Sequence, residues 1–139
     1  MVHPKIKQIT FSFLFFTMLN PVLYAQNKVK LTVEFSNVES EEGEIFAQII
    51  EADETIHSSH KLDAKEGAQL VIEGLSPGTY RVRVFQDLNG NEEMDKNFMG
   101  IPREPYGFSN NVKPNMGPPD KDKMFFKIRE DKKIEILLQ

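Results

Sequence analysis

Residues 74–95 read GLSPGTYRVRVFQDLNGNEEMD, and this stretch decides the predicted fold. Apolar and charged side chains alternate over residues 80–85, a period of two that predicts a half-buried β-strand with Arg81 and Arg83 in solvent. Pro77-Gly78, just before the strand, predicts a type II turn because proline presets φ and glycine accepts a positive φ. The stretch therefore combines a turn, a strand and a polar loop.

The same alternation recurs along the chain and predicts an all-β fold. Further strands are expected at residues 29–35, 45–50, 68–73, 123–129 and 132–138. The last two should form a tight hairpin at Asp131-Lys132. One or two further strands should lie in residues 51–67 and 108–113, with residues 57–60 in a loop or a short edge strand. No segment of helical length carries an apolar stripe with a 3.6-residue period. We therefore predict a single antiparallel two-sheet sandwich of about seven strands.

The predicted strands also define a core. Apolar residues on one face of each strand should pack together between the sheets: Phe35, Ile49, Ile72, Val82, Phe126 and Ile136.

Residues 1–25 have the pattern of a cleaved signal peptide. Two lysines precede an apolar segment at residues 9–19, which is too short to span a bilayer as a helix. Ala25 supplies a small residue before the expected cut. We therefore expect residues 26–139 to form one domain that is exported and is either periplasmic or secreted.

The mature chain carries an excess of negative charge. The formal net charge of −4 becomes −6 after cleavage, because the leader contains two lysines and no acidic residue. A negative balance argues against nucleic acid or an anionic membrane surface as partner. No apolar run after the leader approaches the length of a membrane-spanning helix. We expect no nucleic-acid partner and no membrane insertion of the mature chain.

The loop after the central strand is the strongest candidate site. Oxygen-bearing side chains stand at every second position: Asp87, Asn89, Asn91, Glu93 and Asp95. They match ligand positions of an EF-hand loop, although Glu92 stands where glycine normally allows the sharp turn and Phe98 where a bidentate acid belongs. Two interpretations remain open: a weak Ca²⁺ site between strands, or a type I′ hairpin turn at Asn89-Gly90 with solvated acids.

Residues 100–111 contain two prolines, two glycines and the aromatic residues Tyr106 and Phe108. A stiff loop with exposed aromatics suits a ligand surface, but the same side chains could fold back onto one end of the sandwich.

Two motifs could suggest an enzyme. Residues 74–78 match the G-x-S-x-G pattern of hydrolases, but the helix and the later histidine that this chemistry needs are missing from the sequence. His57 and His60 supply too few ligands for a catalytic zinc. We expect no enzymatic activity.

Three segments carry a resemblance to a known family: GLSPGTYRVRVFQD, DLNGNEEMDKN and MGIPREPYGFSNN. With these, the chain resembles the domain of unknown function 2141 family of small exported bacterial proteins over about residues 28–138. The resemblance implies an immunoglobulin-like or prealbumin-like sandwich with no assigned biochemical activity. Members of that family usually carry glycine at the position of Glu92, so this chain departs from the pattern there.

The sequence thus predicts an exported, non-enzymatic β-sandwich that serves as a binding or accessory module. Its partner would be a protein or glycan at the cell envelope, and Ca²⁺ is the one cofactor that the residues suggest. The alternative is a calcium-dependent carbohydrate-binding or adhesive module, with Tyr106 and Phe108 as its stacking platform.

Overall fold

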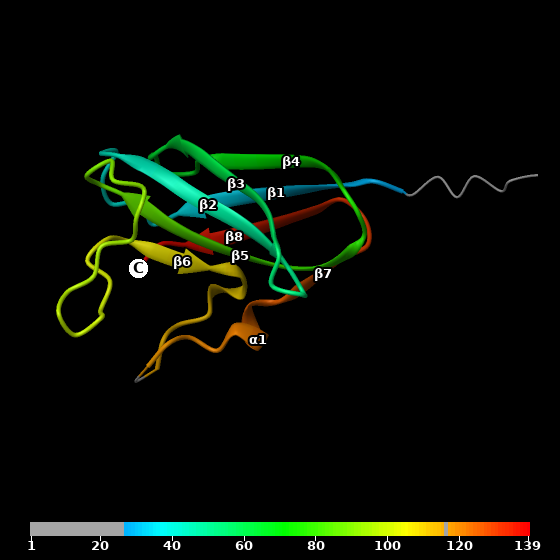
Figure 1. Cartoon of the computed structure of the whole chain (residues 1–139). Coiled ribbons are helices and arrows are strands. Elements are labelled where there is room, and N and C mark those ends of the chain that lie inside the picture. Colours follow the sequence, from blue (N-terminus) through cyan, green and yellow to red (C-terminus); the bar gives the residue numbers. More distant parts are fainter. Residues whose placement is uncertain (1–26, 116) are drawn as a thin grey trace, which may run out of the picture.

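The computed structural model describes residues 27–115 and 117–139, and most of its elements are strands (Figure 1). The strands are β1 (Val29–Ser36), β2 (Glu44–Glu51), β3 (Ile56–Asp63), β4 (Gln69–Leu75), β5 (Gly78–Asp87), β6 (Tyr106–Phe108), β7 (Phe126–Ile128) and β8 (Lys132–Leu137). Two short helical segments, η1 (Ser109–Asn111) and α1 (Lys121–Met124), lie between β6 and β7. The predicted signal peptide lies outside the described residues.

The strands form two packed sheets, which confirms the predicted all-β sandwich. One sheet has the order β4-β1-β8, and the other has the order β3-β2-β5-β6 with β7 also paired to β5. Most neighbours are antiparallel, but β1 and β8 run parallel, from Leu31 opposite Lys132 to Ser36 opposite Leu137. The prediction of a purely antiparallel sandwich is therefore wrong at this pair. No helix among the described residues has the length and apolar character needed to cross a membrane.

The core lies between the two sheets and comes from alternate residues of the strands. In β1, for example, every second side chain from Val29 to Phe35 is buried. The six predicted core residues all belong to one buried cluster: Phe35, Ile49, Ile72, Val82, Phe126 and Ile136. The predicted core is thereby confirmed.

The strands β7 and β8 do not form the predicted hairpin. β7 pairs with β5 in one sheet, whereas β8 pairs with β1 in the other. Asp131 lies in the connection between β7 and β8, and its carboxylate accepts a hydrogen bond from the backbone N–H of Lys30 at 2.8 Å. This contact holds the connection next to β1. α1 also takes up the beginning of the strand predicted at residues 123–129. Alternation reveals the buried face of a strand but does not reveal its neighbour.

The further strand expected within residues 51–67 is present as β3, but it has eight residues and includes residues 57–60, which were predicted as a loop or a short edge strand. β3 pairs along β2 and forms one edge of the larger sheet, so most of its side chains are polar and exposed and give little apolar signal. The predicted type II turn is also wrong. Gly78 belongs to β5 and has no positive φ, whereas Gly74 at the end of β4 has a φ of 73°.

Arg81 is buried, contrary to the prediction that it faces solvent. Its side chain forms an ion pair with Glu54, and its Cζ atom lies 5.7 Å from the centre of the Phe125 ring. The segment after α1 thus covers this part of the outer sheet face, which no local pattern in β5 could indicate. Arg83 is exposed, as predicted, and its Nε donates a hydrogen bond to the Gln48 side chain at 2.6 Å.

The two sheets meet along the side formed by β6 and β8. The backbone N–H of Gln139 donates to the carbonyl of Tyr106 at 2.9 Å, so the end of the chain lies alongside β6. Gly107 allows this approach, because a Cβ at that position would lie 2.8 Å from the carbonyl oxygen of Leu137. β6 is thereby fixed against both sheets, and with it the returning end of the loop at residues 88–105.

Candidate functional site

The candidate site is the loop at residues 88–105, which leaves the end of β5 and returns as β6. Figure 1 shows it in yellow-green, standing away from both sheets. Its base is closed by ladder pairing between Phe85 and Tyr106 and by a hydrogen bond from the N–H of Gln86 to the carbonyl of Pro105 at 2.8 Å. The loop is therefore a long excursion from a hairpin, mounted on the central strand of the larger sheet.

Asp87, the last residue of β5, organises the first half of the loop. Its side chain is 3% exposed. Oδ1 accepts hydrogen bonds from the backbone N–H groups of Gly90 at 2.8 Å and Asn91 at 3.3 Å, and Oδ2 accepts one from Glu92 at 2.7 Å. The backbone therefore curls around one buried carboxylate.

These contacts determine the protonation of Asp87. Burial is the largest single influence and opposes ionisation, but the hydrogen bonds from the amides of Glu92, Gly90 and Asn91 together outweigh it. The pKa of Asp87 is therefore lowered from its ordinary value. The carboxylate is negatively charged at neutral pH.

The other predicted ligands lie in the same curl. Asn89 and Asn91 donate from their side-chain amides to the two oxygens of Asp95, at 2.6 Å and 3.2 Å. The side-chain oxygen of Asn91 accepts a bond from the backbone N–H of Glu93 at 2.8 Å. The structure thus brings together the five residues that the sequence predicted: Asp87, Asn89, Asn91, Glu93 and Asp95.

The loop is not the type I′ hairpin turn that was the alternative interpretation. A type I′ turn needs a positive φ at both central residues. Gly90 has a φ of 75°, but Asn89 is not among the residues with positive φ. The second left-handed residue is Glu92, with a φ of 62°, at the position where calcium loops usually carry glycine. Its side chain forms an ion pair with Lys61 at 2.5 Å.

Sequence reasoning missed Glu104, which is 5% exposed beneath the loop. Its carboxylate accepts hydrogen bonds from the backbone N–H of Leu88 at 2.9 Å and of Asp95 at 3.1 Å. Glu104, on the returning half of the loop, therefore connects Leu88 and Asp95, which lie at the two ends of the curl formed by residues 87–95. The only available signal was an acid amid the prolines and glycines of residues 100–111, and no spacing rule singles it out.

The fit of this loop to a cation is partial. Within residues 27–115 and 117–139, no three acidic or histidine side chains converge as a ready-made metal site. Phe98, at the twelfth position of the EF-hand pattern, is 97% exposed and supplies no oxygen. The loop does hold five oxygen-bearing residues around one turn, and the side-chain amides of Asn89 and Asn91 donate hydrogen bonds to Asp95 where a cation would otherwise bind it. The side-chain oxygens of Asn89 and Asn91 accept hydrogen bonds from the backbone N–H groups of Asn91 and Glu93, so turning either oxygen toward Asp95 would break that bond.

Tyr106 and Phe108 do not plug one end of the sandwich, because both lie on β6, half-buried and outside the core cluster. Cross-strand register places Tyr106 opposite Phe85 and Phe85 opposite Phe46. Directly opposed residues share a face, so these three aromatic side chains form a row across the outer face of the larger sheet. The Phe46 and Phe85 ring centres are 5.3 Å apart, and those of Tyr106 and Phe108 are 5.7 Å apart.

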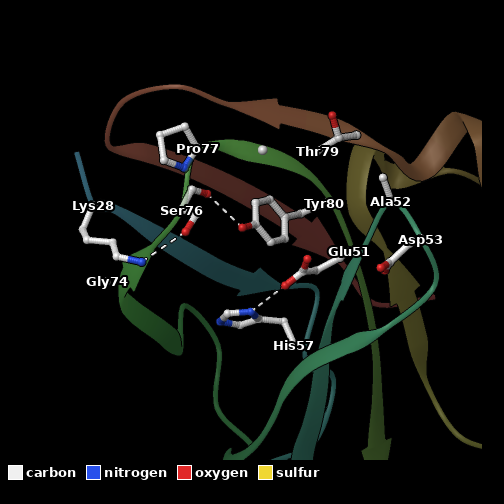
Figure 2. A pocket seen from close by; sticks show the side chains of 11 residues that line it. Lys28, Glu51, Ala52, Asp53, His57, Gly74, Ser76, Pro77, Thr79 and Tyr80 are labelled. Carbon is white, nitrogen blue, oxygen red and sulfur yellow. Dashed lines mark hydrogen bonds and ion pairs between the residues drawn. The ribbon is translucent and has the colours of Figure 1, made fainter. Parts of the chain in front are cut away.

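A second feature is a shallow pocket of about 390 Å³ near the start of β5 (Figure 2). It brings Ser76 of the G-x-S-x-G match near His57. However, the Ser76 hydroxyl accepts from Lys28 Nζ at 3.1 Å, while His57 Nδ1 bonds Glu51 at 3.0 Å and the Tyr80 ring lies between the two pairs. Nucleophilic catalysis needs a direct bond between nucleophile and base, and this pocket has none.

The two histidines also do not form a metal pair. His57 and His60 both lie on β3, and residues three apart on a strand point to opposite faces. His60 instead bonds the Ser58 hydroxyl at 2.9 Å, and burial together with the nearby His57 lowers the pKa of His60.

Comparison with known proteins identifies a family. A family model described as "Uncharacterized protein conserved in bacteria (DUF2141)" matches residues 33–136, a span that contains the loop, the aromatic row and most of the core. No curated protein and no solved structure matches the chain. The chain therefore belongs to the bacterial DUF2141 family.

Proposed function

We propose that the protein is an exported, non-enzymatic binding module of the cell envelope, whose loop at residues 88–105 is stabilised by one weakly bound Ca²⁺. The observation that carries the proposal is the curl of backbone around the buried Asp87 carboxylate. The left-handed Glu92 supports it, because a side chain in this conformation costs of the order of 1 kcal/mol and such strain tends to persist where a site needs it. Export is supported by the pattern of the first 25 residues.

The ligands in this proposal are the carboxylates of Asp87 and Asp95, the side-chain oxygens of Asn89 and Asn91, and the carbonyl of Glu93. Ca²⁺ would neutralise the acids and hold the loop in one shape. The chain's own residues supply the rest: Glu104 ties the ends of the curl, and the Lys61–Glu92 ion pair fastens its middle to β3. A structural cation at this place would stiffen a surface without taking part in a reaction.

Thermal unfolding of residues 26–139 in EDTA and in several millimolar CaCl₂ tests the site. A weak extracellular site has a Kd of roughly 10⁻⁴–10⁻³ M, so Ca²⁺ should raise the free energy of unfolding by about 1–2 kcal/mol. That corresponds to an increase of several degrees in Tm. Asp95→Ala should abolish the increase, because Asp95 accepts only side-chain amides in the loop and its loss leaves the backbone curl intact.

Asp122→Ala is the matched control, since it removes an exposed acid on α1 away from the loop. This variant should keep the full response to Ca²⁺. Identical melting of the unmodified chain in EDTA and in Ca²⁺ would refute the calcium site. An equal loss of response in both variants would show a general charge effect.

The second candidate function is calcium-dependent carbohydrate binding or adhesion, and the aromatic row favours it. Aromatic faces pack against the C–H faces of sugars, and the Arg83–Gln48 pair beside the row supplies polar groups for hydroxyls. On a glycan array, binding should weaken about tenfold or more in Tyr106→Ala and disappear in EDTA. Phe98→Ala, an exposed aromatic outside the row, should bind like the unmodified chain. Binding that is indifferent to Tyr106 would remove this candidate.

A further inference from the structure

The tip of the loop carries the three most exposed large hydrophobic side chains in the described part of the chain. Phe98 is 97% exposed, Met99 69% and Ile101 54%. These three residues, here called the apolar tip, are adjacent around Gly100. Single exposed apolar residues are ordinary on protein surfaces, but three together at the end of a projecting loop form a patch that marks an interaction.

The apolar tip is held in a defined shape. The Asn97 side-chain oxygen accepts hydrogen bonds from the backbone N–H groups of Met99 at 2.9 Å and Ile101 at 3.0 Å. The backbone N–H of Asn97 donates to the carbonyl of Ile101 at 2.8 Å, and Lys96 pairs with Pro102 in an isolated bridge. The tip is therefore a built turn that keeps its apolar side chains in water, away from the core.

Two exposed cations flank the apolar tip. Lys96 and Arg103 stand just below it on the two arms of the loop, and neither forms an ion pair within the described residues. The neighbouring acids Asp95 and Glu104 keep their charge, because their hydrogen-bond partners are neutral amides. However, Asp95 is half-buried and Glu104 is 5% exposed, whereas Lys96 and Arg103 are exposed. The exposed charges next to the apolar tip are therefore both positive.

We propose that the apolar tip inserts into the interfacial region of a phospholipid bilayer, with Lys96 and Arg103 at the level of the phosphates. Apolar and aromatic side chains bury themselves shallowly at this depth, and cations just above them are attracted to anionic headgroups. A projecting tip with its own hydrogen bonds can enter a lipid surface without a shaped partner. The negative charge of the rest of the domain repels an anionic surface, which orients the molecule tip-first. The net charge of the mature chain, from which we argued against an anionic membrane surface as partner, does not describe the surface at the tip of one loop.

The experiment uses residues 26–139, which contain all eight strands and the entire core cluster. The chain has no tryptophan, so Phe98→Trp places one fluorescent reporter at the tip. With vesicles of phosphatidylcholine and phosphatidylglycerol, its emission should shift to shorter wavelength. Val71→Trp, at a 51% exposed position on β4, should not shift. All measurements are made in EDTA, so the result is independent of the proposed calcium site.

Vesicle co-sedimentation compares two matched variants, Ile101→Ser at the apolar tip and Val71→Ser on β4. Ile101→Ser should weaken binding by about tenfold or more, because a large apolar side chain no longer leaves water. Val71→Ser removes an apolar side chain of similar exposure, 51% against 54%, and should bind unchanged. Lys96→Glu should weaken binding to the anionic vesicles and leave binding to pure phosphatidylcholine vesicles unaffected.

Three results would overturn the proposal. The first is the absence of both the emission shift and co-sedimentation with either kind of vesicle. The second is vesicle binding that Ile101→Ser and Val71→Ser affect equally. The third is concentration-dependent dimerisation that Ile101→Ser abolishes while vesicles have no effect, which would make a second copy of the chain the occupant.

Discussion

Replacing Gly43 with alanine should destabilise the domain by about 2–5 kcal/mol. Gly43 has a φ of 72°, which costs a residue with a side chain about 1–2 kcal/mol. In addition, a Cβ at this position would lie 2.0 Å from the carbonyl oxygen of Asp87. The obstacle is backbone, so relief requires moving either the turn before β2 or the end of β5, and such overpacking adds about 1–3 kcal/mol. Urea denaturation of residues 26–139 measures the loss.

Gly67→Ala is the matched control, because Gly67 has a φ of 70° but a Cβ added there would meet nothing within 4 Å. Gly67→Ala should lower the free energy of unfolding only by the cost of placing a side chain at a positive φ, about 1–2 kcal/mol. Equal losses in the two variants would contradict the steric argument.

The turn that contains Gly43 is also connected to the base of the candidate site. Gln86 Nε2 donates hydrogen bonds to the carbonyls of Ser40 at 2.9 Å and Glu42 at 2.7 Å. Gly43→Ala should therefore weaken the Ca²⁺ response as well.

The period-two pattern was sufficient to predict the sheets and the core, because a strand buries alternate side chains whatever its neighbours are. It could not predict pairing. The parallel alignment of β8 with β1 depends on contacts between residues a hundred positions apart, such as Asp131 with Lys30. The burial of Arg81 depends on Phe125 and Glu54, which reach it from other segments. The full length of the edge strand β3 could not be predicted, because most of its side chains are polar and exposed and show little apolar alternation.

The residues of the candidate site also fall into those that sequence spacing could predict and those that depend on the fold. Spacing along the chain was enough to group Asp87, Asn89, Asn91, Glu93 and Asp95, because all five belong to one local curl. Glu104 enters from the returning arm of the loop, and its role depends on how that arm folds back. The aromatic row depends on register across three strands, so Tyr106 was the one member apparent from sequence. The apolar tip was not predicted, because its exposure depends on how the loop projects from the sheets and the sequence shows only scattered apolar residues within a loop.

Asp87→Ala should lower the free energy of unfolding at neutral pH by about 2–4 kcal/mol, even without Ca²⁺. Three backbone N–H groups lose a charged acceptor at once, and a bond to a charged group contributes about 1.5–3 kcal/mol. The effect should be smaller than the sum of three such bonds, because the loop can relax toward water. Asp95→Ala is the comparison, and since Asp95 holds only side-chain amides its loss should cost under about 1 kcal/mol. Equal costs would show that Asp87 does not organise the curl.

The cost of losing the Asp87 carboxylate should also depend on pH, with a sign that follows from its lowered pKa. A carboxyl whose pKa is lower in the folded than in the unfolded protein contributes stability that is fully present above the unfolded value, about 3.9 for aspartate. That contribution is lost as the pH falls through the folded value. The gap in unfolding free energy between the unmodified chain and Asp87→Asn should therefore be constant from pH 7 to about pH 5 and narrow below about pH 4. Taking the difference between the two proteins cancels the acid sensitivity of other carboxyls with lowered pKa, such as Glu34. A gap that widens on acidification would mean that burial, which raises the pKa of a carboxyl, outweighs the three amides, and the loop would then lack the charged centre that its calcium chemistry requires.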